Sequence, residues 1–189
     1  MLVCLLCWLV KINRTHYEQY YFTCHLNTSY PIPTHVSIVT NPCEKPRIFI
    51  PIFVPIRSPW THKFAICVPV SFWSIDPFQL IEWIEANRIF GVSEINIYHV
   101  NMTEETLQIL RHFAENDTIV RLHEIPSVPF YVHSRSGNKI GSPISLNDCM
   151  YRNIYRYRWV ISVDFDEIIV PKKQKDYTAM LKEIDKKEK

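Results

Sequence analysis

The stretch Val160-Ile-Ser-Val-Asp164-Phe-Asp166-Glu167-Ile-Ile-Val-Pro171 decides how the rest of this sequence is interpreted. An apolar run, typical of a buried β-strand, leads directly into three carboxylates. Asp164 and Asp166 are two residues apart, so in an extended backbone their side chains point the same way. Two neighbouring carboxylates repel each other unless a cation joins them, and oxygen ligands favour Mg²⁺ or Mn²⁺. The stretch therefore predicts a metal site; the alternative is a solvated turn whose acidic residues cap a helix.

Strands and helices alternate along the chain before this stretch. Apolar runs predict strands over 64–69, 95–100, 118–125 and 159–163, with helical periodicity between them. This alternation predicts an α/β fold with a mainly parallel sheet and helices on both faces. Ligands of such sheets bind beyond the carboxyl ends of the strands, where the acidic stretch is expected to lie.

Local signals also place the ends and the buried faces of the helices. Asp76 and Pro77 predict the start of the first helix and Gly91 its end. The second helix is expected over 103–115, and a capping box at Ser145–Asp148 is expected to open the third after a polar loop over 126–144. The residues expected to face the core are Phe78, Ile81, Ile84, Leu107, Leu110, Phe113, Leu146, Cys149, Met150, Ile154 and Tyr157.

The composition excludes several classes of protein. The chain has 189 residues, of which 47% are hydrophobic and 21% charged, so it can build a core. Its 21 basic and 19 acidic residues give a net charge of +2, which is too balanced for an electrostatic nucleic-acid binder, and no nucleic-acid partner is expected. The three glycines, at 91, 137 and 141, fit neither a G-x-G-x-x-G loop nor a P-loop.

Three further segments flank the alternating region, 63–171. Residues 1–12 begin with an apolar run that is about half of the ~20 residues a membrane-spanning helix needs, and they are interpreted as a signal or anchor remnant. An ordinary apolar helix or strand is the alternative. Residues 13–62 are rich in proline and aromatic residues and predict a lead-in with extended pieces at 36–39 and 47–54. Residues 172–189 predict a charged, solvated helical tail.

Four N-x-S/T sequons agree with a secretory route. They lie at Asn13, Asn27, Asn101 and Asn116. Asn101 and Asn116 fall in the alternating region, and we expect both side chains at the surface.

Six cysteines bear on the same question of compartment. The C-x-x-C pair at 4–7 lies inside an apolar run without a second ligand pair, which argues against a zinc or redox site. The other four, Cys24, Cys43, Cys67 and Cys149, could form two disulfides in any of three pairings. For Cys67, which falls in an apolar strand pattern, a buried free thiol is the alternative.

Several separated motifs resemble those of glycosyltransferase family 92. The resemblance covers about Phe64 to Pro171 and rests on motifs in the same order along the chain. They are the strand Phe64–Pro69, the run Leu80-Ile-Glu-Trp-Ile-Glu, Phe90-Gly-Val-Ser, Ile97-Tyr98, Ser145-Leu-Asn-Asp-Cys149 and Val163–Pro171. The family more often has Leu where this chain has Phe165. The resemblance implies a GT-A fold, a divalent cation (usually Mn²⁺, or Mg²⁺), and a type II membrane protein in the Golgi. It also implies transfer of galactose from UDP-galactose to a glycan acceptor with inversion.

The resemblance further implies the parts of a donor site. Asp166 would bind the metal directly and Asp164 partly through ribose or water, while the metal neutralises charge on the departing UDP. Glu167 is expected to support the following turn, with indirect support of the metal as the alternative. The catalytic base, a carboxylate that removes the acceptor proton, is expected downstream of this chain.

The nucleotide sugar is expected over the ends of the first two strands and the start of the helix before the acidic stretch. The expected contact residues are Pro69, Val70, Ser71, Tyr98, His99, Asn147 and Asp148. Asn101 is a further candidate that competes with its sequon. Helix capping is the alternative for Asp148, and an ordinary strand position is the alternative for His99.

Family members usually continue well beyond the acidic stretch, so the chain is expected to be a C-terminally truncated member. A non-catalytic secreted remnant and a metal-dependent phosphohydrolase are the alternative functions. Dehalogenase-type phosphatases also carry D-x-D after an apolar strand. In those enzymes the motif ends the first strand, whereas here three predicted strands precede it.

Overall fold

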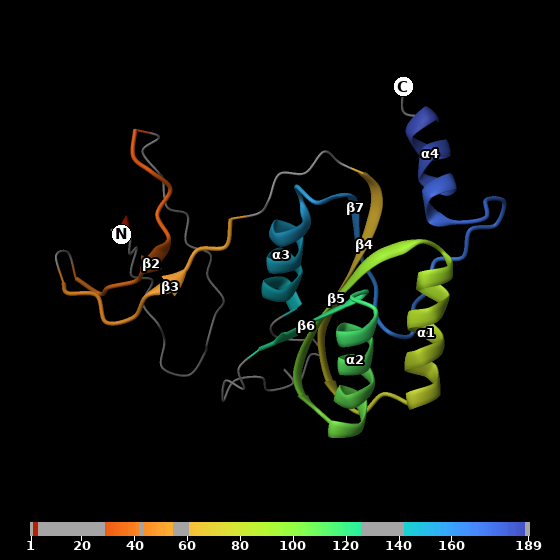
Figure 1. Ribbon diagram of the computed structural model, residues 1–189, viewed down its shortest axis with the longest axis horizontal. Coiled ribbons are helices and arrows are strands. Elements are labelled where there is room, and N and C mark those ends of the chain that lie inside the picture. Colours follow the sequence, from red (N-terminus) through yellow and green to blue (C-terminus); the bar gives the residue numbers. More distant parts are fainter. Residues whose placement is uncertain (1, 4–28, 42–43, 55–60, 126–141, 188–189) are drawn as a thin grey trace. The chain divides into compact units, whose positions relative to one another are not determined.

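A computed structural model describes residues 2–3, 29–41, 44–54, 61–125 and 142–187 of the chain (Figure 1). The chain divides into two compact units, Met1–Val54 and Pro55–Lys189. The boundary lies eight residues before the predicted one between 62 and 63, in the proline-rich lead-in.

The first unit contains a small sheet. Its strands are β1 (Leu2–Val3), β2 (His35–Ser37) and β3 (Ile50–Pro51), in the order β1-β2-β3. β1 is parallel to β2, and β2 is antiparallel to β3. β2 overlaps the extended piece predicted at 36–39, and β3 lies within the one predicted at 47–54, so both predictions are confirmed. Apart from β1, the segment interpreted as a signal or anchor remnant lies outside the described residues.

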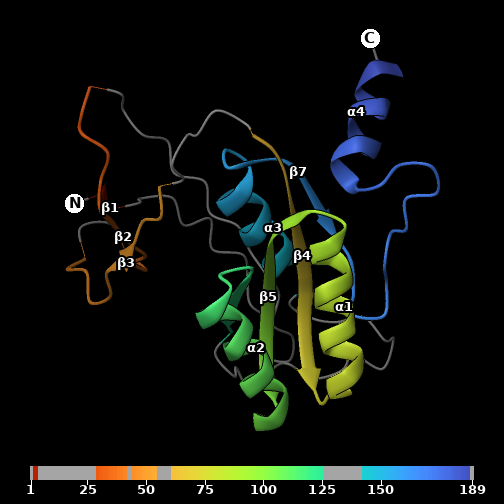
Figure 2. The same cartoon turned by 45° about the vertical axis from the view of Figure 1, so that its right-hand side comes forward.

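The second unit is built on a four-stranded parallel sheet. Its strands are β4 (Thr61–Trp73), β5 (Val92–Met102), β6 (Val120–Glu124) and β7 (Tyr157–Ser162), in the order β6-β5-β4-β7. All three strand pairs are parallel. Figure 2 shows β4 and β5 side by side as the long central strands. The predicted α/β class and all four predicted strands are confirmed.

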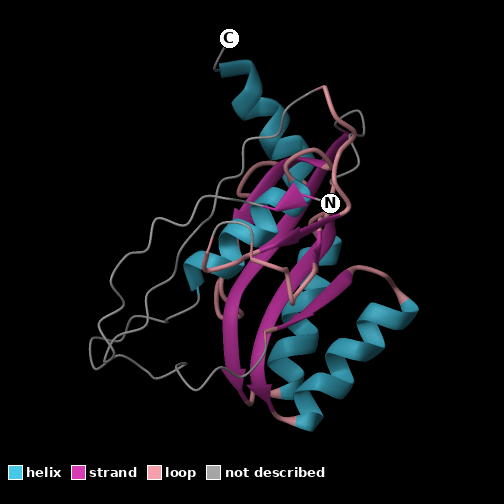
Figure 3. Ribbon diagram, turned by 90° about the vertical axis from the view of Figure 1, so that its left-hand side faces the viewer, coloured by secondary structure: helices cyan, strands magenta, loops and turns pink. Residues whose placement is uncertain are grey.

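Among the described residues of this unit, four helices accompany the sheet: α1 (Pro77–Ile89), α2 (Glu104–Asn116), α3 (Ser142–Asn153) and α4 (Tyr177–Lys187). Alternate residues of a strand face opposite sides of its sheet. In β4, Ile66 and Val68 join the core cluster that holds residues of α1 and α2, whereas Cys67 joins the cluster that holds Cys149 of α3. Helices therefore cover both faces of the sheet, as expected (Figure 3).

The order of the strands creates a switch in direction at the centre of the sheet. From β4 the chain passes through α1, β5 and α2 to β6, moving steadily to one side. It then passes through α3 on the opposite face and returns as β7, on the other side of β4. The switch point is therefore between β4 and β7. In parallel α/β sheets, the carboxyl ends of the strands at such a point form the usual ligand crevice.

The buried face predicted for α1 is partly wrong. Phe78 is 82% exposed and Ile81 is 39% exposed, while Leu80, Trp83 and Ile84 are buried. The observed set has the i, i+3, i+4 spacing of a helix face that packs on a sheet. The predicted start is confirmed, because Asp76 accepts a hydrogen bond from the N–H of Gln79 at 2.9 Å.

α3 begins earlier than the predicted capping box. Its first residue is Ser142, and the hydroxyl of Ser145 donates back to the main-chain oxygen of Ser142 at 2.9 Å, so Ser145 lies inside the first turn. Met150 and Ile154 are each 41% exposed, and Tyr157 belongs to β7. Their predicted place on the buried face of the helix is wrong. Small and polar residues take that place instead: Ser145, Cys149 and Asn153.

The C-terminal helix belongs to the core of the second unit. The predicted amphipathic helix is confirmed from Tyr177 to Lys187, but it is not a solvated tail. Tyr177 is fully buried, with its ring centroid 4.9 Å from that of Phe64 on β4, and Leu181 is 9% exposed. The tail packs because Tyr177 and Leu181 are one helical turn apart and share its apolar face.

Candidate functional site

The acidic stretch forms a closed turn at the end of β7. The strand ends at Ser162, and the N–H of Glu167 donates to the main-chain oxygen of Asp164 at 3.1 Å. In return, Oε2 of Glu167 accepts from the N–H of Asp164 at 3.0 Å. The expected extended backbone at Asp164–Asp166 is therefore wrong, because these two bonds stabilise a reversal of the chain. Glu167 has a structural role, but in the turn 164–167 that contains both aspartates and not in the following turn, where it was predicted.

The turn is fastened to the core by aromatic residues. Phe165 is only 9% exposed, and its ring meets that of Trp83 edge to face with centroids 5.1 Å apart. The indole Nε1–H of Trp83 donates to the main-chain oxygen of Glu167 at 2.7 Å. Asp166, by contrast, is exposed and Asp164 is half-buried. The acidic turn, residues 164–167, thus combines an apolar anchor with carboxylates that reach solvent.

The register places the acidic turn beside the end of β4. The N–H of Val163 donates to the oxygen of Cys67 at 3.3 Å, and β4 continues from there through Pro69, Val70 and Ser71. The pairing of β4 with β5 shifts register between Val68 and Ser71, where Pro69 lacks an N–H. The side chain of Val70 is fully buried, so only its main chain is left to contact a ligand. The predicted metal residues therefore follow β7, and the predicted nucleotide segment lies on the neighbouring strand β4, at the switch point.

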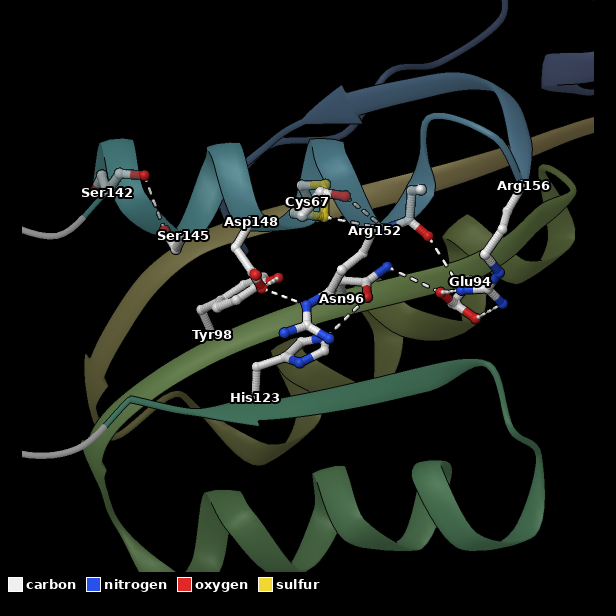
Figure 4. The surroundings of a disulfide bond; sticks show 12 residues. Cys67, Glu94, Asn96, Tyr98, His123, Ser142, Ser145, Asp148, Arg152 and Arg156 are labelled. Carbon is white, nitrogen blue, oxygen red and sulfur yellow. Dashed lines mark hydrogen bonds and ion pairs between the residues drawn. A yellow bond between two sulfur atoms is a disulfide. The ribbon is translucent and has the colours of Figure 1, made fainter. Parts of the chain in front are cut away.

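Two other predicted contact residues meet each other directly. The hydroxyl of Tyr98 on β5 donates to Oδ2 of Asp148 on α3 at 2.6 Å, as Figure 4 shows. The same oxygen accepts from Nε of Arg152 at 2.6 Å. Asp148 lies in the second turn of α3, so it joins the helix to the sheet rather than capping it. Asn147 donates to the main-chain oxygen of Pro143 at 2.7 Å.

His123 on β6 extends this contact across the sheet. Its ring stacks on that of Tyr98 with centroids 4.5 Å apart, and Nε2 lies 3.0 Å from Oδ1 of Asn96. Burial, together with the nearby charge of Arg152, lowers the pKa of His123 below its usual range. Burial and the hydrogen bond to Asp148 raise the pKa of Tyr98 well above its usual range. His123 is therefore neutral at pH 7 and Tyr98 keeps its proton.

Glu94 lies on the same face of β5 as Asn96 and Tyr98, and it forms a buried ion pair that was not predicted from the sequence. Arg156 donates to both carboxylate oxygens of Glu94, at 2.9 Å and 2.8 Å (Figure 4). Nε of Arg121 lies 3.4 Å from Oε2 of the same carboxylate. Burial alone would raise the pKa of Glu94, but the hydrogen bonds and charge of Arg156 outweigh it and hold the pKa below the usual range. The signal in the sequence was Glu94 itself, a carboxylate that directly precedes the apolar run at 95–100.

His99 does not join the other predicted contact residues. It alternates with Tyr98 along β5 and so lies on the face that carries α1 and α2. It is 9% exposed, and burial lowers its pKa. The structure therefore separates His99 from the Tyr98–Asp148 contact.

A disulfide joins Cys67 on β4 to Cys149 on α3. Both cysteines are buried, at 2% and 0% exposure, and their Cα atoms are 6.1 Å apart. This settles the alternatives for Cys67 in favour of a disulfide. The remaining cysteines lie outside the described residues. Disulfides persist in oxidising compartments, which is consistent with the secretory pathway.

Two of the four sequons can be placed. Asn101 and Asn116 are both exposed, which confirms the expected surface positions. Asn101 has φ of 50° at the end of β5, and the side chain of Asn116 donates to the main-chain oxygen of His112 at 3.0 Å. Asn13 and Asn27 lie outside the described residues.

The donor set of the acidic turn fits a hard divalent cation with an incomplete protein shell. Within the described ranges, no three His, Cys, Asp or Glu side chains form a cluster that could hold a metal ion. Mg²⁺ is usually bound through one or two carboxylates, with water and substrate phosphates as its other ligands. Two aspartates on a turn at the ligand edge match that arrangement. Among the helices of the described residues, none has the length and apolarity to cross a membrane.

Comparisons with known proteins agree with this architecture. The family model for glycosyltransferase family 92 matches residues 62–189, which include the parallel sheet except its first residue, Thr61. The chain is also 28% identical over 118 residues to the beta-1,4-galactosyltransferase galt-1 of Caenorhabditis elegans. That alignment covers 59% of this chain and 26% of the relative, so the chain spans about a quarter of the relative's length. Members of this family are transferase enzymes that use a sugar donor and an acceptor. From the family match over its C-terminal two thirds, the chain belongs to glycosyltransferase family 92.

Proposed function

We propose that this chain forms the donor-binding part of a metal-dependent glycosyltransferase. Its donor is a UDP-hexose, with UDP-galactose as the first candidate, because the relative it resembles is a galactosyltransferase. The sugar passes with inversion to a hydroxyl of a glycan acceptor.

One observation carries the proposal: the acidic turn stands at the switch point of the sheet. Asp164 and Asp166 lie just after β7, and the segment Pro69–Ser71 lies near the carboxyl end of the neighbouring strand β4, which ends at Trp73. A crevice between such strand ends is where parallel α/β sheets bind nucleotides. The two carboxylates give this crevice the ligands for a cation that binds a diphosphate.

Each element of the site has a distinct task under this proposal. Asp164 and Asp166 hold Mn²⁺ or Mg²⁺. A bound ion supplies Lewis-acid stabilisation of the charge that develops on a diphosphate leaving group. Pro69–Ser71 offers main-chain groups to the nucleoside. Tyr98 and Asp148 are engaged with each other, so they keep α3 against the sheet.

The reaction forms a bond from the acceptor oxygen to the anomeric carbon and breaks the bond from that carbon to the diphosphate oxygen. UDP leaves with the electron pair, and the acceptor proton passes to a general base. We assign that base to a part of the enzyme beyond the residues described. The proposal also includes a luminal Golgi location with an N-terminal membrane anchor. The disulfide and the exposed sequons at Asn101 and Asn116 support it.

Calorimetry of UDP binding to the disulfide-bonded chain tests the proposal. We expect UDP to bind in the presence of Mn²⁺ and to lose at least tenfold in affinity when EDTA replaces the metal. The variant Asp166→Asn should bind UDP with and without Mn²⁺ as weakly as wild type does in EDTA. The matched control is Glu115→Gln, which also neutralises an exposed carboxylate but lies near the C-terminus of α2, away from the ligand edge. UDP affinity that does not depend on Mn²⁺, or that Asp166→Asn leaves unchanged, would refute the assignment.

A further inference from the structure

We propose that Trp83 of α1 is a positioning residue for the acidic turn, and that it holds the two aspartates in the geometry that binds the metal. This inference rests on the proposed function and adds a residue to it. Trp83 has no route to the metal itself, because it is 5% exposed and its polar atom is occupied by the main chain of Glu167.

The indole hydrogen bond acts on the residue that closes the turn. Nε1–H of Trp83 donates to the oxygen of Glu167 at 2.7 Å. Glu167 is tied to Asp164 twice, through its N–H at 3.1 Å and through its carboxylate at 3.0 Å. Fixing Glu167 therefore fixes the main chain of Asp164, so one side chain on α1 determines where the turn closes.

The ring of Trp83 holds the turn at a second point. Phe165 lies between the two aspartates in the sequence, and its ring packs edge to face on the indole, with centroids 5.1 Å apart. Phe165 is 9% exposed, so its burial supplies the apolar attraction that draws the turn toward α1. The indole thus contacts the turn at residues 165 and 167, on either side of the exposed Asp166.

Anchoring the turn on Trp83 opposes the repulsion between the carboxylates of Asp164 and Asp166. Without a cation, two carboxylates in one turn repel each other and favour a looser conformation. A binding site must hold its ligands within about 0.5 Å of the productive geometry, through neighbours whose own conformations are fixed. Trp83 is fixed by its place on α1 and by its burial under the turn. It therefore lowers the ordering cost that metal binding would otherwise meet.

The variant Trp83→Phe separates the two contacts. It keeps an aromatic ring near Phe165 and removes the N–H that reaches Glu167. Losing one neutral hydrogen bond at this position should weaken Mn²⁺ binding about three- to tenfold in the presence of saturating UDP. Phe165→Leu, which keeps the apolar anchor but removes the ring contact, should weaken it in the same direction.

A core variant far from the turn distinguishes positioning from loss of stability. Phe113 on α2 is 6% exposed and belongs to the same core cluster as Trp83, and its ring meets that of His112 on its own helix, with centroids 5.9 Å apart. Phe113→Leu should lower the midpoint of thermal unfolding as much as Phe165→Leu while leaving Mn²⁺ affinity unchanged. The indole N–H signal of Trp83, assigned in wild type by its loss in Trp83→Phe, should shift in NMR spectra when Mg²⁺ and UDP are added.

The outcomes separate this inference from the proposed function. Weaker Mn²⁺ binding in the Trp83→Phe and Phe165→Leu variants, with Phe113→Leu unchanged, supports the inference. Wild-type affinity in Trp83→Phe, while Asp166→Asn no longer binds, overturns the inference and leaves the proposed function standing. Equal Mn²⁺ affinity in wild type and Asp166→Asn overturns both. If Trp83→Phe does not fold, a Trp83 indole signal assigned through Phe165→Leu decides the matter, because a signal that Mg²⁺ and UDP leave unmoved contradicts the inference.

Discussion

Replacing Arg156 by Met should destabilise the second unit by about 2–3 kcal/mol at neutral pH. Arg156 donates to both carboxylate oxygens of Glu94, and the side chain of Glu94 is only 3% exposed. Its removal leaves a buried carboxylate whose remaining partners are Asn96 at 3.2 Å, Arg121 at 3.4 Å and the side chain of Tyr157. The loss should appear in the free energy of unfolding.

The size of this loss of stability follows from the burial of Glu94 and from the partners that Glu94 keeps. Removing one partner of a fully buried ion pair costs about 3–5 kcal/mol, because the other charge stays desolvated. Here the side chain of Arg156 is 36% exposed, so part of its interaction is screened by solvent, and Arg121 still offers some compensation. We therefore place the cost below that range, at about 2–3 kcal/mol.

The pH dependence gives this prediction a second signature. In wild type the pKa of Glu94 is held below its unfolded value, so its stabilisation is fully present above about pH 4.3 and is lost as the pH falls through the folded pKa. In Arg156→Met, Arg156 no longer offsets the effect of burial, so the pKa of Glu94 in the folded state should rise. The stability gap between wild type and variant should therefore narrow as the pH is lowered from 7 toward 4.

Urea unfolding followed by tryptophan fluorescence at about pH 7 and pH 5 measures both effects. The matched control is Arg121→Met, which removes a more exposed arginine, 51% exposed and 3.4 Å from the same carboxylate. It should cost less than about 1 kcal/mol. An Arg156→Met variant that is no less stable than Arg121→Met, or a gap that stays constant with pH, would refute this account of the buried pair.

Three further expectations follow from the packing. Cys149→Ser should lower the free energy of unfolding by about 4–5 kcal/mol on the chain-entropy estimate, because the bridge to Cys67 spans a sequence separation of 82; reductant should then have no further effect on the unfolding of the second unit, whose two cysteines form this bridge. Leu80→Ala should cost about 2–5 kcal/mol in denaturant unfolding, whereas Phe78→Ser should cost about 0.5 kcal/mol or less, since Leu80 is fully buried and Phe78 is 82% exposed; equal costs would contradict the observed face of α1. Because burial lowers the pKa of His123, its contribution to stability is full above about pH 6.5 and is lost as the pH falls below that value, so His123→Gln should flatten the pH dependence of unfolding between about pH 7 and pH 5.

The elements that could be predicted from the sequence are those that depend on residues close together in the chain. The apolar runs at 64–69 and 95–100 lie within β4 and β5, because strands buried on both faces are rich in apolar residues. Asp76 marked the start of α1 because a cap acts on a residue three positions away. The lead-in strands were found for a similar reason, since proline excludes helix locally.

The features that escaped sequence reasoning depend on partners distant in the chain. On α1 two apolar faces competed, and only the sheet beneath could select Leu80 over Phe78. The ion pair of Glu94 with Arg156 joins residues 62 positions apart, and no local pattern links them. The acidic turn is anchored on Trp83, 84 positions away, and no local pattern predicts that contact; its closure by Glu167 acts over only three positions.

Counting the Mn²⁺ ions bound per chain, by electron paramagnetic resonance with saturating UDP, tests most directly whether the acidic turn is a metal site. The account predicts that wild type binds one Mn²⁺ and that the double variant Asp164→Asn, Asp166→Asn binds none at the same concentrations. If the double variant retains the ion, or if wild type binds none while UDP is present, the central claim is contradicted.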